Sequence, residues 1–365
     1  MKECRVKDIC IKGSSNLKQK DVEGKKGLYP VYGASGIISS IDTYHQENEY
    51  IAIVKDGSGI GRVSFMPPKS SVIGTMQYIL PKEGYDIRYI GYCLQSLGLN
   101  KYKQGAAIPH IYFRDYGERN IVVSENINEQ RRIVSYLDSS YKLIDEIKNK
   151  ALKSLTEAKA LFQSALAEAM EPKEGWEEKT LGELCSIIGG GTPSKKNSSY
   201  YNGDIPWATV SDMNCDYLQN TICKISDDGV KNSSTQIISK NEVIIATRVG
   251  LGKVCILCQD TAINQDLKGI IPKSDNKLIR KFIFWWFRSK SNYIVSNGVG
   301  ATVKGVKLSF VSNLKISLPT ISTQKQIVSH LDKLSSKVRA IEEKYQKMVE
   351  ECDALKQAML RDVFE

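Results

Sequence analysis

Apolar residues recur at helical spacing through two long stretches of the chain, residues 127–170 and 321–365. Neither stretch contains Gly or Pro, and both are rich in Lys, Glu, Ala, Leu and Gln, which favour helices. The pattern therefore predicts two long helices. At a rise of about 1.5 Å per residue, each helix would be about 66 Å long.

The two predicted helices are copies of one sequence. They align without a gap, and the identical positions include Gln130 with Gln324 and the run Ile133–Ser135 with Ile327–Ser329. The pair Leu137–Asp138 likewise matches Leu331–Asp332. A repeat over so long a distance indicates a duplicated half-molecule rather than a solenoid unit.

Apolar positions in these helices alternate spacings of three and four residues, which is the seam of a coiled coil. In the second helix the seam is Leu331, Leu334, Val338, Ile341, Tyr345, Met348, Cys352, Leu355 and Met359. The aligned positions of the first helix are Leu137, Ser140, Ile144, Ile147, Ala151, Ser154, Ala158, Leu161 and Ala165. Because the seam residues of the first helix have smaller side chains, that helix could approach a bulkier partner closely. We predict that each helix is the other's partner; the alternative is two long surface helices on one globule.

Two further regions repeat each other in plan: residues 1–126, the first lobe, and residues 171–320, the second lobe. A buried strand is predicted at residues 49–55 and its counterpart at residues 243–249, each followed by a glycine-rich turn. Because another strand follows the turn at residues 56–62, a tight hairpin is favoured over a phosphate-binding loop, which requires a helix there.

Each lobe also contains one predicted amphipathic helix, at residues 86–97 and 275–288. The order of elements is lobe, helix, lobe, helix. This order predicts an α+β fold with a pseudo-twofold internal repeat. The strands are alike and the loops differ, as expected when one scaffold presents loops for different ligands.

The net charge of +10 over 365 residues, with a pI near 9.0, favours a polyanionic partner, usually nucleic acid. A basic proteome average is the alternative explanation. No apolar run approaches the length of a membrane span, and the first residues lack the apolar core of a signal peptide. We therefore expect a cytoplasmic protein without a membrane partner, whose nine cysteines are reduced thiols.

Motifs for catalysis or metal binding are weak. The three histidines have no metal-ligand spacing, and neither GxSxG nor HExxH occurs. Asp21, Glu23 and Lys25 resemble a nuclease cluster but lie in a turn-rich loop. Cys255 and Cys258 form a single CxxC in a strand-like run, whereas a zinc site needs four ligands. We expect no catalytic residue and no metal site in this chain.

The loops are better suited to DNA, because phosphates attract Lys and Arg and base edges are read by polar side chains. Candidates in the first lobe are Tyr32, Lys55, Arg62, Lys103, Gln104 and Arg114. Candidates in the second lobe are Thr192, Ser194, Lys195, Lys196, Arg248, Lys253, Asn264, Gln265, Thr302 and Lys304. For any one of these cations, a solvated surface charge is the alternative.

These features together resemble the specificity subunit of type I restriction–modification systems. The resemblance rests on YPVYGASG at residues 29–36, on GGGTPS and YYNGDIPW in the second lobe, and on the two helix starts NEQRRIVSYLD and STQKQIVSHLD. The first lobe departs from the pattern because it lacks a GGTP-like start, so the two lobes are expected to recognise different half-sites.

The resemblance implies two target-recognition domains, residues 1–126 and 171–320, joined by two antiparallel coiled-coil helices. Residues 127–170 would be the central spacer helix and residues 321–365 the C-terminal one. Each domain would read half of a split site in double-stranded DNA. Two methyltransferase (modification) subunits and the motor–nuclease (restriction) subunits would be the partners and would carry S-adenosylmethionine, ATP and Mg²⁺, with no cofactor in this chain. The alternatives are a coiled-coil scaffold that binds protein without reading DNA, and a stand-alone DNA-modifying enzyme.

Overall fold

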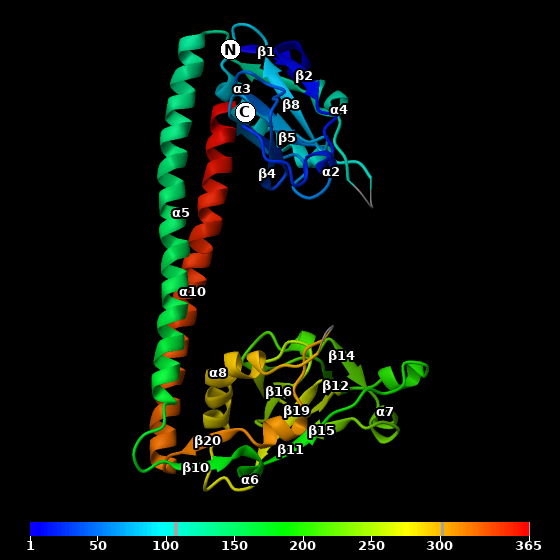
Figure 1. The fold of residues 1–365 in the computed structure, drawn as a ribbon, viewed down its shortest axis with the longest axis vertical. Helices are drawn as coiled ribbons and strands as arrows, with labels where there is room; N and C mark the ends of the chain where they lie inside the picture. Colours follow the sequence, from blue (N-terminus) through cyan, green and yellow to red (C-terminus); the bar gives the residue numbers. More distant parts are fainter. Residues whose placement is uncertain (106–108, 301–302, 365) are drawn as a thin grey trace. The chain divides into compact units, whose positions relative to one another are not determined.

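The computed structural model describes residues 1–105, 109–300 and 303–364, and the chain divides into two compact units. The first unit is Met1–Lys153 with Tyr345–Glu365, and the second unit is Ser154–Lys344. The two long predicted helices are present as α5 (Ile127–Ala169) and α10 (Ile321–Phe364), and each contributes to both units (Figure 1). The predicted mixture of lobes and long helices is confirmed.

The first lobe is built on two β-sheets. One is antiparallel, in the order β2 (Cys10–Ser14), β8 (Met76–Pro81), β5 (Tyr50–Val54), β6 (Val63–Met66). The other has the order β4 (Gly36–Ile41), β3 (Tyr29–Gly33), β7 (Ser71–Val72). A separate pair, β1 (Lys2–Arg5) with β9 (Asn120–Val123), ties the start of the chain to the strand that precedes α5. The helices are α1 (Val6–Ile9), α2 (Gln19–Val22), α3 (Ile87–Ser96), η1 (Leu99–Tyr102) and α4 (Phe113–Gly117).

Strand β5 is the centre of this lobe, since all five of its residues are buried. Its side chains alternate between two cores, as the two-residue period of a strand requires. Ile51 and Ile53 pack in the cluster that contains α3 and the ends of α5 and α10. Tyr50, Ala52 and Val54 pack in a second cluster with residues of β6, β7 and β8.

The second lobe has the same plan with more strands. A five-stranded sheet has the order β11 (Cys185–Gly189), β19 (Leu267–Pro272), β16 (Val243–Ala246), β17 (Val254–Leu257), β13 (Tyr217–Leu218). A four-stranded sheet has the order β14 (Cys223–Ile225), β12 (Ile205–Ala208), β18 (Thr261–Ile263), β15 (Gln236–Ile238). The pair β10 (Glu177–Thr180) with β20 (Lys315–Leu318) corresponds to β1 with β9. The helices are α6 (Leu181–Leu184), η2 (Ser198–Tyr201), η3 (Val210–Asp212), α7 (Asp227–Lys231), α8 (Arg280–Ser296) and α9 (Leu308–Ser312).

Helix α8 is the counterpart of α3 and lies between the five-stranded sheet and the long helices of this unit (Figure 1). It begins at Arg280 and ends at Ser296, whereas the sequence pattern predicted residues 275–288. The helix starts later because the N–H of Ile279 donates to Oε1 of Gln324 at 2.9 Å, which turns the chain there. The predicted hairpin after β5 and the helix at residues 86–97 are confirmed by the β5–β6 pairing and by α3.

A buried glutamine near the start of each long helix joins that helix to its lobe. Gln130 and Gln324 are both 0% exposed. Oε1 of Gln130 accepts from the N–H of Asp86, the residue that caps α3, at 2.7 Å. Nε2 of Gln130 donates to the carbonyls of Ser124 and Gly84, at 2.8 and 3.2 Å. One side chain thus satisfies three backbone groups.

Gln324 repeats this arrangement in the second unit. In addition to accepting from Ile279, it donates through Nε2 to the carbonyls of Lys277 and Pro319, at 2.9 and 3.0 Å. The matched glutamines of the repeat are therefore structural. Each fixes the start of the lobe helix relative to the long helix.

The matched aspartates make a second junction about two turns further along each helix. Asp138 accepts from Nη2 of Arg88 at 2.7 Å and from the hydroxyl of Tyr92. Burial, and then the bond to Asp138, raises the pKa of Tyr92 to about 12. Asp332 accepts from Nζ of Lys281 at 2.7 Å and from Nε1 of Trp285 at 3.0 Å.

Within each unit, α5 and α10 lie side by side and antiparallel. In the first unit the Tyr141 hydroxyl donates to the carbonyl of Lys356 at 2.9 Å, and Lys148 pairs with Asp353 at 2.6 Å. In the second unit Lys159 lies 4.0 Å from Glu342. The predicted pairing of the two helices is confirmed within each unit.

The predicted seam is buried or half-buried at most of its positions and needs correction at four of them. Leu137, Ile144 and Leu331 are buried, and Leu334, Val338 and Met348 are half-buried. The predicted seam residues that are exposed instead are Ile147 at 42%, Leu161 at 68%, Ile341 at 39% and Leu355 at 51%.

The contacting residue lies one position later in each of these cases, at Lys148, Phe162, Glu342 and Lys356, which are buried or half-buried. A straight α-helix has about 3.6 residues per turn, so spacings of three and four both keep a residue near the contact face. The neighbouring packing decides between them: Phe162 contacts Trp285 of α8, with ring centroids 5.8 Å apart.

We predict that Gln324→Ala lowers the unfolding free energy of the second unit by roughly 2 to 4 kcal/mol, because three buried backbone groups lose their partners. The four tryptophans, Trp176, Trp207, Trp285 and Trp286, all belong to the second unit. Urea unfolding followed by tryptophan fluorescence therefore reports on this unit.

The matched change Gln130→Ala should leave that fluorescence transition nearly in place while it destabilises the first unit, as seen by circular dichroism. Gln326→Ala, at an exposed position of α10, is the surface control. An equal shift for Gln326 and Gln324 would contradict the structural role of Gln324.

Candidate nucleic-acid interface

Polar loops of the second lobe meet at one end of its five-stranded sheet. β16 ends at Ala246, which pairs with Leu267 at the start of β19, and β11 ends at Gly189 opposite Lys268. The N–H of Val306 donates to the carbonyl of Thr247 at 2.9 Å, which brings the loop before Val306 to the same end. Segments far apart in the sequence thus form one polar surface.

Asp266 connects the polar side chains at this end. Its Oδ1 lies 3.7 Å from Nη1 of Arg248, and its Oδ2 accepts from Nδ2 of Asn264 at 3.2 Å. Nε2 of Gln265 donates to the same oxygen at 3.4 Å, while Oε1 of Gln265 accepts from the hydroxyl of Thr192. The Asp266 side chain is only 15% exposed, so its charge orients these groups from below the surface.

Two glycines allow the loop after β11 to lie against this cluster. A Cβ at Gly190 would be 2.2 Å from the carbonyl oxygen of Ile263 and 2.3 Å from that of Asn264. The carbonyl of Gly191 accepts from Nε1 of Trp207 at 3.2 Å and from the hydroxyl of Thr235 at 2.6 Å. Gly190 and Gly191 of the GGGTPS motif are therefore needed for a close backbone approach, because a Cβ at Gly191 would likewise be 2.6 Å from the backbone of Ser234.

The corresponding end of the first lobe carries a different set of side chains. Nδ1 of His110 lies 2.6 Å from Oδ1 of Asp56, just after β5. Nε2 of Gln104 donates to Asp115 at 3.0 Å, and Gln104 also forms a β-bridge with His110. Nζ of Lys55 lies 3.9 Å from Oδ2 of Asp56. In the first lobe the carboxylate of Asp56 thus lies beside a histidine and a lysine, whereas in the second lobe the carboxylate of Asp266 lies beside an arginine.

The structure places the first-lobe candidates as follows. Lys55 and Arg62 lie at the two sides of the β5–β6 hairpin. Lys103 and Gln104 lie in the segment that bridges to His110, and His110 in turn bridges to Asp56 of the hairpin. Arg114, on α4, stacks on Tyr112, with its guanidinium carbon 4.6 Å from the ring centre. Tyr32 is half-buried and packs between the sheets, so it is less accessible than the other candidates.

In the second lobe, Thr192, Arg248 and Gln265 are brought together, and Lys304 lies in the loop that bridges to Arg248. Ser194, Lys195 and Lys196 are exposed in the loop after β11. Thr302 lies outside the described residues.

Two of the second-lobe candidates serve the lobe itself. Nζ of Lys253 donates to Oδ1 of Asn214 at 3.0 Å and to the carbonyl of Val210 at 3.4 Å. Asn264 is 6% exposed and bonded to Asp266, so it supports the surface rather than forming it.

The sequence patterns missed Asp266 and Lys268. Nζ of Lys268 donates to the carbonyls of Gln265 and Leu267, at 2.7 and 3.0 Å, and burial lowers the pKa of Lys268. A search for donors that contact DNA passes over an acidic residue. The only available signal was the placement of Asp266 directly after two amide side chains.

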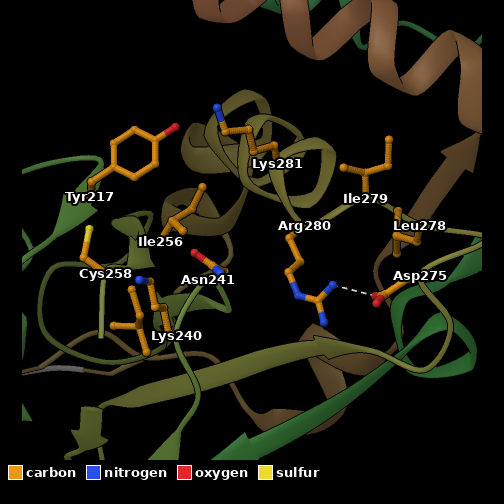
Figure 2. A pocket seen from close by; sticks show the side chains of 11 residues that line it. Tyr217, Lys240, Asn241, Ile256, Cys258, Asp275, Leu278, Ile279, Arg280 and Lys281 are labelled. Carbon is orange, nitrogen blue, oxygen red and sulfur yellow. Dashed lines mark hydrogen bonds and ion pairs between the residues drawn. The ribbon is translucent and has the colours of Figure 1, made fainter. Parts of the chain in front are cut away.

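A cavity of about 560 Å³ lies at the opposite end of the five-stranded sheet (Figure 2). Its lining includes Tyr217 and Ile256 from the sheet, Asp275 from the segment before α8, and Arg280 and Lys281 at the start of α8. Arg280 pairs with Asp275 and also with buried Glu242, at 2.5 and 2.7 Å, which fixes the start of α8. These side chains serve the junction of α8 with the sheet.

Across residues 1–105, 109–300 and 303–364, no group of three or more His, Cys, Asp or Glu side chains is arranged to hold a metal ion. Over the same residues, no helix is both long enough and apolar enough to cross a membrane.

Comparison with known proteins assigns both halves of the chain to one family. The sequence model of the type I restriction modification DNA specificity domain matches residues 1–157 and again residues 173–351. The chain belongs to this family. Its two lobes, each with the first part of a long helix, are two copies of the specificity domain.

Similar family members come from bacteria and archaea. The chain is 28% identical over 271 residues to the type I restriction enzyme EcoR124I/EcoR124II specificity subunit of Escherichia coli, a match that covers 70% of this chain. It is 30% identical over 165 residues to the MjaIX specificity subunit of Methanocaldococcus jannaschii, which covers 44% of this chain. The chain spans 65% and 38% of the length of these two relatives.

A solved structure shows the same fold. The structure comes from work on complex assembly and conformational transition of the type I R-M system. One of its chains superposes on this chain with a TM-score of 0.78 at 19% identity. The superposition covers 99% of this chain and 96% of that chain. The two chains therefore have the same fold.

We predict that Gly190→Ala destabilises the second unit by about 1 to 3 kcal/mol, because the added methyl group would overlap two backbone carbonyls. Gly189→Ala is a matched control, since a Cβ there meets nothing within 4 Å. Urea unfolding monitored by tryptophan fluorescence measures both. Equal midpoints for the two variants would contradict the close approach of this loop in the specificity domain.

Proposed function

We propose that this chain is the DNA sequence-specificity subunit of a type I restriction–modification complex and has no catalytic role of its own. In this proposal each lobe reads one half of a bipartite site in double-stranded DNA. One observation carries it: each lobe presents loops at the corresponding end of its own central sheet, and the two sets of loops carry different charged side chains. A common scaffold with divergent reading loops suits a protein that recognises two different half-sites.

The electrostatics support a polyanionic ligand. The loops at the sheet end of the second lobe contain Lys195, Lys196, Arg248, Lys304 and Lys307, and Asp266 is the acidic residue set beneath them. Cations on exposed loops suit phosphate contacts, which supply most of the affinity for DNA without specifying its sequence.

We further propose two methyltransferase subunits and the motor–nuclease subunits as partners in the cytoplasm. S-adenosylmethionine, ATP and Mg²⁺ would bind to those subunits. The support is that similar family members are named specificity subunits of type I restriction enzymes.

The test is a gel shift with the partner methyltransferase present, together with single-molecule mapping of methylated adenines in a host that carries both proteins. A bipartite methylated motif is the expected result. Assembly with the methyltransferase but without any sequence preference would instead favour a protein-binding scaffold, and methylation by the isolated chain would favour a stand-alone enzyme.

We predict that the double variant Lys195→Gln, Lys196→Gln weakens DNA binding by the complex similarly for all sequences. Each lost phosphate contact should reduce the slope of log K against log salt by about 0.9. Titration of fluorescent duplexes at several salt concentrations measures this slope. Lys325→Gln, at an exposed position of α10, should leave the slope unchanged.

We also predict that the long helices set the gap between the half-sites. Insertion of four residues between Lys153 and Ser154 would lengthen α5 by about 6 Å. Because duplex DNA rises about 3.4 Å per base pair, the methylated motif should gain one to two base pairs in its gap. Methylation mapping checks this, and altered half-sites with an unaltered gap would contradict it.

A further inference from the structure

The loops follow β5 in the first lobe and β16 in the second, and the backbone hydrogen bonds at these two strand ends are alike. They show which residues of the two lobes occupy corresponding positions. The N–H of Lys55 donates to the carbonyl of Thr75 at 3.0 Å, and the N–H of Thr247 donates to the carbonyl of Asp266 at 2.8 Å. Lys55 therefore corresponds to Thr247, and Thr75 corresponds to Asp266.

A second set of contacts extends the match by one residue. The carbonyls of Lys55 and Thr247 accept from Ile111 and Val306, both at 2.9 Å. The next residue in each lobe forms a β-bridge to the adjoining loop, Asp56 with His110 and Arg248 with Gly305. Arg248 of the second lobe thus occupies the position of Asp56 in the first.

Side-chain chemistry is inverted at this shared position. In the second lobe an arginine stands over the carboxylate of Asp266, whereas in the first lobe the matched pair is a carboxylate, Asp56, beside Thr75. His110, at 2.6 Å from Asp56, has no counterpart at Gly305. The same backbone position therefore carries a hydrogen-bond donor, the guanidinium of Arg248, in the second lobe and a hydrogen-bond acceptor, the carboxylate of Asp56, in the first.

Arg248 has the features of a side chain that reads a base. Its side chain is 56% exposed, while its backbone is fixed by the bridge to Gly305. The Asp266 carboxylate lies 3.7 Å from one guanidinium nitrogen, which orients the fork and places a negative charge where an approaching phosphate would be repelled. The lysines of the neighbouring loops are better placed for phosphates.

We infer that Arg248 is a base-reading residue of the second lobe, that Asp266 is its positioning residue, and that together they specify a G·C pair in one half-site. The inference rests on the proposed function. An arginine fork donates two hydrogen bonds to O6 and N7 of guanine, and an aspartate has no N–H group with which to make them. The first lobe cannot read guanine through this position, since the carboxylate of Asp56 accepts hydrogen bonds and would suit the amino group of cytosine.

The test is methylation mapping in a host that carries this chain and its partner methyltransferase. In Arg248→Ala, which removes the donors, the methylated motif should relax at a single G·C pair of one half-site, with the preference for guanine falling by about 10-fold or more. Asp266→Asn, which keeps the shape but removes the charge, should relax the same position to a smaller degree. The other half-site and the gap should be unchanged in both variants.

Two matched controls accompany these variants. Asp275→Asn breaks another arginine–aspartate pair of the same lobe, at the far end of the sheet, and should leave the motif intact. Asp56→Asn should leave the guanine position unchanged because it lies in the other lobe. Tryptophan fluorescence should give unaltered unfolding midpoints for the Arg248 variant, whose side chain is exposed.

The outcomes are distinct. A wild-type motif that lacks a G·C pair in both half-sites, or a uniform loss of methylation with an unchanged motif in Arg248→Ala, overturns the inference and leaves the proposed function standing. In the second case Arg248 would be a phosphate contact. A wild-type chain that directs no sequence-specific methylation removes the proposed function itself.

Discussion

Each lobe is attached to its long helix by a fully buried glutamine, and the placement of the reading surface depends on that attachment. A buried amide without partners would cost a few kcal/mol, so the three backbone groups around Gln130 and those around Gln324 fix one geometry for the junction. The glutamine holds the start of the lobe helix, α3 or α8. That helix packs on the central sheet, and the far end of the sheet carries the loops. The aspartates at 138 and 332 hold the same helices a second time through side-chain donors.

This arrangement separates the parts of a lobe that are constant from those that vary. Backbone hydrogen bonds between strand ends and loops are the same in both lobes, and they do not depend on the side chains that the loops present. Asp56 and Arg248 can therefore occupy one backbone position with opposite charges. A protein that must recognise two unrelated half-sites benefits from this separation, because a loop can change its chemistry while the junction and sheet remain intact.

The two long helices are held together by packing and by ion pairs. Their buried side chains include large ones nearer the ends, such as Phe162 and Leu360, and the small Ala151 nearer the middle of α5. The ion pairs between the helices, Lys148 with Asp353 and Lys356 with Asp145, are partly exposed, and each contributes no more than about 1 kcal/mol. Packing therefore supplies most of the stability of the helix pair, and the ion pairs mainly favour the antiparallel orientation.

The sequence alone determined the duplication, the two long helices, the hairpin after β5 and the family. These depend on local pattern: matched runs such as Gln130 to Asp138, helical periodicity, and a strand following a glycine-rich turn. It did not determine which of two adjacent apolar residues, such as Leu161 or Phe162, is buried, because both spacings fit a helical period. It also could not show that Asp266 orients Arg248 and Gln265, or that Lys253 and Asn264 are engaged within the lobe. Those contacts join residues from different strand ends, and only the folded sheet brings them within hydrogen-bonding distance.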